Sequence, residues 1–585
     1  MEAPNVNTLW GRIVADELAK SGVRSAVLAP GSRSTPLTIA FAEHPDIETF
    51  SQLDERSAAF FALGRAKQTG RPTPLVCTSG TAGANFHPAV IEAHQSRIPM
   101  VVLTADRPTE LQHSGANQTI DQERLYGDAV RHNRTLPEPE AAARKLRSLR
   151  TALSRAVGTA TGTEPGPVHL DVPFRKPLEP TAGPGAAPEG VPSGKLPEGF
   201  AESEPLAVSG RDGPFVERTD GRATLSKGDR RRLVEAIEDA DSGLIVTGPT
   251  DQPAPARDAL LALARASGFP VLADPLSGHR FGAHVEEAPI CGGYDSYLPA
   301  IEETPDVVIR FGASPTSKPL RHYLRDAEAR QFLVDPAGGW REATFTATDL
   351  VVADETRLAT ELASSLDREA GAYTDRVRDA ERSYWELVAG DEPEEGAVLA
   401  DVAELAPDPA TLFVSNSMLI RNFDRFGQPR GANLAVLGNR GASGIDGITS
   451  TALGAGSATD DPLVLVTGDL AYYHDMNGLL AVSRCGVDAT IVCINNDGGG
   501  IFHVLPIEEH ETFEEWFRTP HGLEFEHSAD LYDLEFARVT DRETFRDRYA
   551  ESVASDGTQV IEMVTDSERS HDDRRALQER VVESI

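Results

Sequence analysis

The chain has 585 residues, of which 40% are hydrophobic and 25% charged, and no apolar run approaches the ~20 residues that span a bilayer. Its 91 acidic and 56 basic residues give a formal net charge of −35, which excludes nucleic acid and acidic membranes as expected partners because like charges repel. The length exceeds what one hydrophobic core supports, so we expect a soluble protein of several domains.

Strand-like apolar runs alternate with helix-like stretches, such as 55–70, in three parts of the chain. The runs of the first part are 25–30, 47–53, 74–79, 99–105 and 167–172. Those of the second part are 242–250, 270–276, 306–314, 332–339 and 349–354. Those of the third part are 411–417, 433–439, 462–469, 489–497 and 559–566. This alternation predicts an α/β protein with three Rossmann-like domains and mostly parallel sheets.

Breaks in composition separate the three parts. A stretch rich in Pro, Gly, Ala and Glu, without any sustained hydrophobic period, predicts a linker over 181–225. We therefore expect a first domain at 1–180, a central domain at 226–370 and a third domain at 371–585.

The cysteines indicate free thiols. Cys77, Cys291, Cys485 and Cys493 are scattered and form no metal-type pairs. Three of them lie in or beside apolar runs, so we expect buried free thiols and neither disulfides nor zinc ligands. The first residues lack the basic-then-apolar pattern of a secretory signal, and we expect a cytoplasmic protein.

Two polar strings follow strand-like runs late in the chain. Gly468-Asp469-Leu470-Ala471 follows one run, and Asn495-Asn496-Asp497-Gly498 follows the next. Their separation fits one strand-helix-strand crossover of roughly 30 residues, which brings both strings to the carboxyl edge of neighbouring parallel strands. Each string alone is typical of a tight turn. Together they predict a shared ligand site.

The donor atoms of these strings indicate the ligand. Asp469 offers a carboxylate, Asn496 an amide oxygen and Gly498 a backbone carbonyl. Hard oxygen donors suit Mg²⁺, which usually takes its remaining ligands from water and substrate phosphates. We predict a magnesium-diphosphate site.

A second candidate residue lies early in the chain. Glu55 stands where a strand is expected to end and a helix to begin, so its carboxylate is expected at the sheet edge. The alternative is a structural role, since a negative charge at a helix N-terminus is favourable.

Longer strings resemble one known family. They lie at 29–37 (APGSRSTPL), 51–60, 78–85, 104–122, 415–424, 439–454 (NRGASGIDGITSTALG) and 495–506 (NNDGGGIFHVLP). The Gly-Asp and Asn-Asn strings resemble the diphosphate motif of thiamine-diphosphate enzymes. The whole set is similar to the 2-succinyl-5-enolpyruvyl-6-hydroxy-3-cyclohexene-1-carboxylate synthases of menaquinone biosynthesis, and it extends along essentially the whole chain.

This resemblance implies thiamine diphosphate with Mg²⁺ or Mn²⁺ as cofactors. The first domain would bind the aminopyrimidine ring through Glu55, and the third domain would bind the diphosphate. In this superfamily the two domains come from different subunits, which implies a homodimer or homotetramer with active sites between chains. The cofactor-binding residues implied are Glu55, Ile445, Gly468, Asp469, Leu470, Ala471, Asn496, Gly498 and Ile501, with Asp469, Asn496 and Gly498 on the metal.

The family decarboxylates 2-oxoglutarate and adds the succinyl-semialdehyde carbanion equivalent to isochorismate in a 1,4-addition. Both substrates are dianions, and arginine binds carboxylates in a bidentate manner. The resemblance implies Arg421 and Ser417 on the distal carboxylate of the donor and Arg33 and Arg107 on isochorismate. The full implied sets are catalytic Glu55, Gln118, Ser32 and Asn117, and substrate-binding Arg33, Arg107, Ser417, Arg421, Arg440, Lys318, Ile501, Phe502 and Leu505.

Each of these roles has a structural alternative. A single arginine on an acidic protein usually forms a surface salt bridge. Ile501, Phe502 and Leu505 would exclude water and Ile445 would support the bent cofactor, or all four are ordinary core. The sequence also departs from the family at 318–319, where a Lys-Arg pair is replaced by Lys318-Pro319, with Arg321 close by.

Two other functions remain open. An acetohydroxyacid synthase or another 2-oxoacid decarboxylase would share the cofactor residues. Comparing turnover of 2-oxoglutarate with turnover of pyruvate distinguishes these enzymes from the synthase family named above. A non-catalytic cofactor-binding assembly protein would keep the fold but lose the chemistry. The presence of Glu55 and of the metal residues argues against this alternative. The acidic, lysine-poor composition resembles proteins of salt-accumulating halophiles, in which molar salt screens self-repulsion.

Overall fold

The computed structural model describes residues 3–180, 194 and 196–585, so that 181–193 and 195 of the predicted linker lie outside the described residues. By compactness the chain divides into two units. The first unit comprises Met1–Asp220, Gly441–Thr459 and Asn477–Val487. The second unit comprises Gly221–Arg440, Asp460–Met476 and Asp488–Ile585. The domain limits given above stay predictions.

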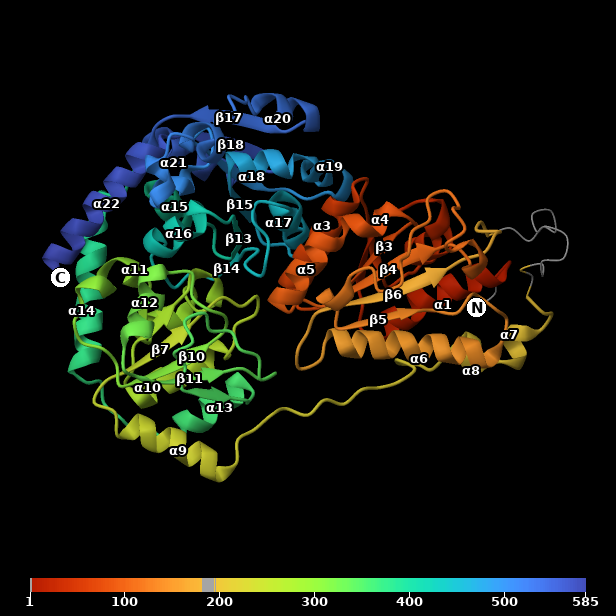
Figure 1. Ribbon diagram of the computed structural model, residues 1–585, viewed down its shortest axis with the longest axis horizontal. Coiled ribbons are helices and arrows are strands. Elements are labelled where there is room, and N and C mark those ends of the chain that lie inside the picture. The colour runs from red at the N-terminus through yellow and green to blue at the C-terminus, as the bar shows by residue number, and fades with distance from the viewer. Residues whose placement is uncertain (1–2, 181–193, 195) are drawn as a thin grey trace. The chain divides into compact units, whose positions relative to one another are not determined.

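The first unit contains a six-stranded parallel sheet in the order β2-β1-β3-β4-β6-β5 (Figure 1). Its strands are β1 (Ser25–Ala29), β2 (Glu48–Ser51), β3 (Thr73–Cys77), β4 (Met100–Asp106), β5 (His132–Thr135) and β6 (Pro167–Pro173). Its helices are α1 (Val6–Lys20), α2 (Thr35–Ala42), α3 (Glu55–Thr69), α4 (Thr81–Asn85), α5 (His87–Ser96), α6 (Ala143–Ala160), α7 (Phe200–Ser203) and α8 (Pro205–Val208). Residues of α1, α2 and α6 form one hydrophobic core with the sheet.

Two further helices complete this unit, α17 (Ile448–Gly456) and α19 (Leu480–Cys485). Helix α17 packs closely on α3, and glycines make the approach possible. A Cβ added to Gly64 would lie 1.9 Å from the carbonyl oxygen of Thr451, and one added to Gly454 would lie 2.1 Å from that of Phe61. Any side chain at either glycine would separate the helices.

The second unit contains two sheets. One has the order β12-β11-β10-β7-β8-β9, and every pairing in it is parallel. Its strands are β7 (Gly243–Thr247), β8 (Val271–Ala273), β9 (Ile290–Cys291), β10 (Val307–Phe311), β11 (Arg330–Val334) and β12 (Asp349–Val351). Its helices are α9 (Lys227–Glu238), α10 (Arg257–Ser267), α11 (Tyr294–Tyr297), α12 (Lys318–Asp326), α13 (Glu355–Ala363) and α14 (Ala372–Val388).

The other sheet has the order β14-β13-β15-β16-β18-β17, again all parallel. Its strands are β13 (Ala410–Val414), β14 (Leu434–Leu437), β15 (Leu463–Gly468), β16 (Thr490–Asn495), β17 (Glu535–Val539) and β18 (Gln559–Val564). Its helices are α15 (Glu394–Leu405), α16 (Met418–Phe426), α18 (Asp469–His474), α20 (Glu526–Tyr532), α21 (Arg542–Ser552) and α22 (Ser567–Ser584). The three parallel sheets confirm the predicted α/β class.

The first and third sheets have the same strand order when their strands are numbered along the chain. In each sheet, the second strand lies on one side of the first strand and the third strand lies on the other side. The order of strands therefore reverses at β1/β3 and at β13/β15. Open α/β sheets bind ligands in the crevice at such a point. We therefore expect site residues in the loops that follow these four strands.

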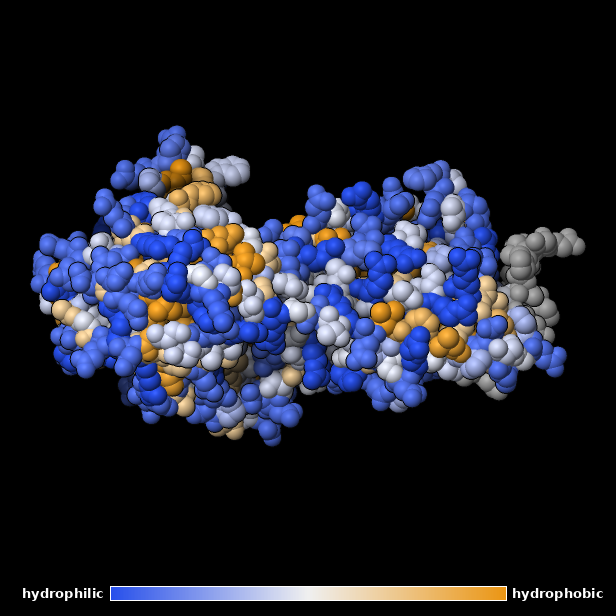
Figure 2. All heavy atoms as spheres, turned by 90° about the horizontal axis from the view of Figure 1, so that it is seen from below, coloured by the Kyte–Doolittle hydropathy of each residue, from blue (hydrophilic) through white to orange (hydrophobic). Residues whose placement is uncertain are grey.

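The surface and the cysteines agree with the composition. Hydrophilic residues cover most of the face drawn in Figure 2, in agreement with a chain of which 25% of the residues are charged. Cys77, Cys291 and Cys493 are buried free thiols and Cys485 is a partly buried one, as predicted. Within the described residues, no helix combines the length and the apolar character needed to cross a bilayer.

Three strands were missed by sequence reasoning: β5, β9 and β17. All three lie at sheet edges, and β9 has only two residues. Most residues of β5 and β17 are partly or fully exposed. Buried and exposed residues therefore do not alternate along these strands. A periodicity argument therefore has no signal to detect in them.

Candidate active site

The two predicted metal-binding loops touch each other. β15 and β16 are parallel neighbours in the third sheet, and Asp469 begins α18 directly after β15. Oδ2 of Asp469 accepts the backbone N–H of Gly498 at 2.9 Å, and Oδ1 accepts the backbone N–H of Leu470 at 2.6 Å. The spacing in the sequence thus corresponds to a direct contact between Asp469 and the turn after β16.

The oxygen atoms of these loops fit a divalent cation. The amide oxygen of Asn496 is buried and has no hydrogen-bond partner in the part of the chain that the structure describes. Asp469 is 3% exposed, and burial raises the pKa of its carboxyl group. Gly498 has a φ of 141°, and a Cβ there would lie 2.0 Å from the carbonyl oxygen of Arg518, so no other residue fits. A bound cation would satisfy the buried amide oxygen and the carboxylate together.

Two side chains that sequence reasoning missed contact these residues, one buried and one half-buried. Glu395 of α15 accepts a hydrogen bond from Nδ2 of Asn496 at 2.8 Å. Nε2 of His521 lies 3.3 Å from Oδ2 of Asp469, while Nδ1 accepts the backbone N–H of Leu523 at 2.9 Å. Nε2 therefore carries the proton and donates to Asp469. Glu395 is far in the sequence from Asn496, and His521 is far from Asp469, so no local motif reveals these contacts.

Three arginines repel one another in the second unit: Arg421 on α16, Arg440 after β14 and Arg321 on α12. Burial, then repulsion from Arg440 and Arg321, lowers the pKa of Arg421. Nη1 of Arg421 donates to the carbonyl oxygen of Ser417 at 2.5 Å, and Nη1 of Arg440 donates to Oδ1 of Asn416 at 2.9 Å. Among the described residues, no carboxylate forms an ion pair with any of these arginines. This arginine cluster (Arg321, Arg421 and Arg440) suits a dianionic ligand.

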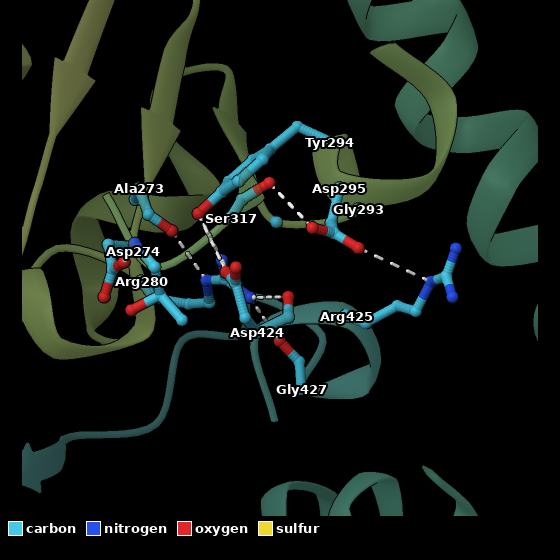
Figure 3. Close-up of polar contacts among 12 residues, drawn as sticks. Ala273, Asp274, Arg280, Gly293, Tyr294, Asp295, Ser317, Asp424, Arg425 and Gly427 are labelled. Atoms are coloured by element: carbon cyan, nitrogen blue, oxygen red, sulfur yellow. Dashed lines mark hydrogen bonds and ion pairs between the residues drawn. The ribbon is translucent and has the colours of Figure 1, made fainter. Parts of the chain in front are cut away.

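A buried polar network holds the helices that carry two of the arginines (Figure 3). Nη2 of Arg280 donates to Oδ1 of Asp424 on α16 at 2.7 Å, and both side chains are fully buried. Ser317, the N-cap of α12, donates to Oδ1 of Asp295 at 2.7 Å. Oδ2 of Asp295 lies 3.8 Å from Nε of Arg425 on α16. Asp295 thus links the start of α12 to α16.

In the first unit, the predicted residues Ser32 and Arg33 lie in the loop that follows β1, in a short helix at Ser32–Ser34. Nη1 of Arg33 donates to the carbonyl oxygen of Phe174 at 2.7 Å, and the residue is 7% exposed. Burial, then repulsion from Arg107, lowers the pKa of Arg33, while Asp106 acts in the opposite direction. Arg33 and Arg107 therefore lie close together at this sheet edge.

The loop after β4 is held against the loop after β3. Nη2 of Arg107 donates to the carbonyl oxygen of Asn117 at 2.5 Å. Gln118 has a left-handed φ of 54°, and its Nε2 donates to the carbonyl oxygen of Ser79 at 3.2 Å. The buried Gln122 accepts the backbone N–H of Gly80 at 2.9 Å. These bonds bring Arg107, Asn117 and Gln118 to the β1/β3 crevice beside Arg33.

Glu55 and Ile445 also belong to the first unit. Glu55 is the first residue of α3, is partly exposed, and has no hydrogen-bond partner for its carboxylate within the described residues. Ile445 is 37% exposed, so ordinary core does not describe it. The backbone N–H groups of 441–443 in the same loop all donate to the buried carboxylate of Glu92, at 2.5 to 2.8 Å. Sequence reasoning did not find Glu92.

The remaining predicted residues lie near the metal loop or at the start of α12. Ile501 and Phe502 are partly exposed in the short helix Gly500–Val504, and Leu505 behind it is 45% exposed. Lys318 is exposed at the first position of α12. The predicted residues of the first unit are Ser32, Arg33, Glu55, Arg107, Asn117, Gln118 and Ile445. Those of the second are Lys318, Ser417, Arg421, Arg440, Gly468, Asp469, Leu470, Ala471, Asn496, Gly498, Ile501, Phe502 and Leu505.

Comparison with known proteins defines the class. Residues 10–125 match the family model described as the thiamine pyrophosphate enzyme N-terminal TPP binding domain, and 422–563 match the corresponding C-terminal TPP binding domain. The fold is shared with a thiamine diphosphate-dependent 4-hydroxybenzoylformate decarboxylase from Rhodococcus jostii, at a TM-score of 0.68 and 18% identity over 95% of this chain and 99% of that one. The protein is a thiamine-diphosphate enzyme.

Full-length relatives define the family within that class. The chain is 72% identical to a 2-succinyl-5-enolpyruvyl-6-hydroxy-3-cyclohexene-1-carboxylate synthase from Natronomonas pharaonis, over 100% of both chains. It is 63% identical to the synthase of Haloarcula marismortui over 100% of both chains, and 44% identical to that of a Roseiflexus species over 98% of both. The chain belongs to the 2-succinyl-5-enolpyruvyl-6-hydroxy-3-cyclohexene-1-carboxylate synthase family.

Proposed function

We propose that this protein decarboxylates 2-oxoglutarate and transfers the remaining four-carbon unit to isochorismate, forming 2-succinyl-5-enolpyruvyl-6-hydroxy-3-cyclohexene-1-carboxylate for menaquinone biosynthesis. The observation that carries the proposal joins two features of the second unit: an arginine cluster that forms no ion pair with a carboxylate among the described residues, and a set of oxygen donors suited to Mg²⁺. Arg421 of the cluster and Asp469 of the donor set follow the neighbouring strands β13 and β15. These residues would hold the cofactor diphosphate and a dianionic substrate on neighbouring loops.

The cofactor roles follow from the donor atoms. Asp469, Asn496 and Gly498 would hold Mg²⁺ or Mn²⁺ and, through it, the diphosphate. Thiamine diphosphate, when bound, supplies the acidic thiazolium carbon on which the donor substrate is decarboxylated. Glu55 would share a proton with the pyrimidine nitrogen N1′. The absence of any hydrogen-bond partner for its carboxylate among the described residues supports this role. Ile445 would support the bent form of the cofactor.

The substrate roles are those that the family resemblance implies, and the positive charge of these side chains supports them. Arg421 and Ser417 would hold the distal carboxylate of 2-oxoglutarate, supported by Arg440. Arg33 and Arg107 would hold the carboxylates of isochorismate, and Lys318 would contribute to binding the same substrate. The reacting carbons would be oriented by three polar residues, Ser32, Asn117 and Gln118. Water would be excluded by three apolar residues, Ile501, Phe502 and Leu505. A local cationic site is needed, because a protein of charge −35 repels dianions at long range.

Mass spectrometry of the product formed from 2-oxoglutarate and isochorismate, with Mg²⁺ and thiamine diphosphate, tests the function. We expect the adduct and one CO₂ per turnover. Pyruvate in place of 2-oxoglutarate should give little product, since it lacks the distal carboxylate. Preferential turnover of pyruvate would instead favour an acetohydroxyacid synthase or another decarboxylase.

We further propose a homo-oligomer, dimer or tetramer, with Glu55 of one subunit and Asp469 of another completing each active site. Mixing the inactive variants Glu55→Gln and Asp469→Ala, with subunit exchange, then yields hybrid dimers that have one intact site. Activity should return to about a quarter of the wild-type value at equal mixing. No recovery after verified exchange would mean that both residues act from the same chain.

The acidic composition and the relatives from Natronomonas and Haloarcula support a protein adapted to high salt. At molar salt the Debye length is about 3 Å, so self-repulsion is screened. Unfolding at low ionic strength, followed by circular dichroism, tests this adaptation. The cytoplasmic location stays a prediction.

A further inference from the structure

Glu395 is a buried acid that the catalytic proposal does not use. It is the second residue of α15 and is 4% exposed. Its carboxylate accepts hydrogen bonds from Nδ2 of Asn496 at 2.8 Å and from Oγ1 of Thr565 at 3.3 Å. Within the described residues, no arginine or lysine forms an ion pair with it. Burying a carboxylate without a cation is costly, so the position needs a reason.

The chemistry of the two groups fixes how Asn496 is oriented. Nδ2 of Asn496 donates to Oε1 of Glu395, so the amide nitrogen faces this side chain. The amide oxygen must then face the opposite way. That oxygen is buried and has no partner among the described residues, and it belongs to the turn that touches Asp469. Gly500 leaves space for this arrangement, because a Cβ there would lie 2.7 Å from Nδ2 of Asn496.

The preceding residue provides an internal comparison. Nδ2 of Asn495 also donates to a buried glutamate, Glu562, at 2.7 Å. However, Oδ1 of Asn495 accepts the backbone N–H of Asp497 at 3.0 Å, and Glu562 is paired with Arg538. Asn495 is thus satisfied at both ends within the chain. Asn496 is satisfied only at its nitrogen, as expected of an amide that is held ready for an external ligand.

We propose that Glu395 is a positioning residue for the metal site, which turns the amide oxygen of Asn496 toward the cation. The inference rests on the proposed magnesium site. Accepting the N–H also polarises the amide and makes its oxygen a better donor. Outer partners of metal ligands typically account for about 10–100-fold in metal affinity.

The first experiment removes the acceptor and measures Mg²⁺-dependent thiamine-diphosphate binding by calorimetry, and Mn²⁺ binding by electron paramagnetic resonance. Glu395→Met keeps the length of the side chain but replaces the carboxylate by a thioether, which is only a weak hydrogen-bond acceptor, so metal affinity should fall by about 10–100-fold. Glu394→Gln, in the same turn of α15 but not bonded to Asn496, serves as the control and should bind like wild type. Wild-type affinity in a folded Glu395→Met variant overturns the inference.

The second experiment reverses the hydrogen bond. Asn496→Asp places two carboxylates face to face, so it should bind metal poorly. In the double variant Glu395→Gln/Asn496→Asp, the new amide donates to the new carboxylate and leaves one oxygen for the cation. Metal affinity should then recover by at least about tenfold over Asn496→Asp alone. If the single variant binds Mn²⁺ as well as the double variant, Glu395 does not orient residue 496.

Two readouts separate failure of this inference from failure of the site itself. Melting temperature and far-ultraviolet circular dichroism of each variant show whether the fold is intact. Asp469→Ala, measured in parallel, should lose metal-dependent cofactor binding. If Asp469→Ala loses metal-dependent cofactor binding while Glu395→Met binds like wild type, only the role of Glu395 is rejected. If both variants bind like wild type, the magnesium site is rejected, and the inference with it.

Discussion

Replacing Glu92 by glutamine should loosen the loop that leads from Arg440 to Ile445. The carboxylate of Glu92, on α5, accepts the backbone N–H groups of 441, 442 and 443 at 2.8, 2.5 and 2.8 Å. Glutamine has one acceptor oxygen and an N–H₂ group that faces a donor, so at least one of the three N–H groups loses its partner. Oγ of Ser96, at the end of the same helix, also donates to Oε1 of Glu92, at 2.8 Å.

The magnitude follows from the type of bond. Hydrogen bonds to a charged group contribute roughly 1.5–3 kcal/mol each, and a buried donor without an acceptor adds a comparable cost. A local loss of about 2–4 kcal/mol raises the open fraction of the loop by about 30- to 1000-fold. Global unfolding of a chain of two compact units is not expected to follow a two-state transition, so the loop must be measured locally.

Hydrogen–deuterium exchange of the amides of 441–443 measures this opening. Protection should fall by about 30- to 1000-fold in Glu92→Gln. It should not change in the control Glu43→Gln, whose side chain is 57% exposed. Equal protection of the loop in Glu92→Gln and wild type would refute the reasoning.

The same contact predicts a pH dependence. Burial acts to raise the pKa of Glu92, but Lys67 and the backbone N–H groups outweigh it, so the pKa lies below the ordinary value. The stabilisation is therefore present above the unfolded pKa of roughly 4.3 and is lost as the pH falls through the folded value. After correction for intrinsic rates, wild type should lose loop protection in acid, and Glu92→Gln should show no such change.

Three further predictions concern the cofactor and the substrates. Asp469→Ala should abolish thiamine-diphosphate binding without unfolding the sheet, and unchanged affinity by calorimetry would reject the metal assignment. Glu55→Gln should bind cofactor but exchange its thiazolium C2 proton about 10²–10⁴-fold more slowly, which magnetic resonance measures; exchange at the wild-type rate would contradict the role of Glu55. Arg421→Ala should slow CO₂ release from 2-oxoglutarate by about 10–100-fold, whereas Arg107→Ala should leave CO₂ release intact and block product formation with isochorismate. If both variants fail equally at CO₂ release, the proposed division of the arginines is wrong.

Much of the fold could be predicted from the sequence, because its signals are local. Apolar runs bounded by polar turns identify the central strands, which are buried on both faces. The helix expected at 55–70 is α3, Glu55–Thr69, with Asp54 as its N-cap. The crossover spacing between Asp469 and Asn496 is likewise local, since one β-α-β unit has a narrow range of lengths. The edge strands β5 and β17 carry no such pattern and were missed.

The sequence by itself therefore determined the class of fold, the family and the loops that carry the donor atoms. Only the tertiary structure decided which side chains hold those atoms in place. Glu395 lies 101 residues from Asn496, His521 lies 52 residues from Asp469, and Glu92 lies about 350 residues from the loop that it binds. A buried acid has no periodic pattern, and the partner that justifies its burial is chosen by packing between elements far apart in the chain. Such contacts have no local signature, because their hydrogen bonds form only after the sheets and helices have come together.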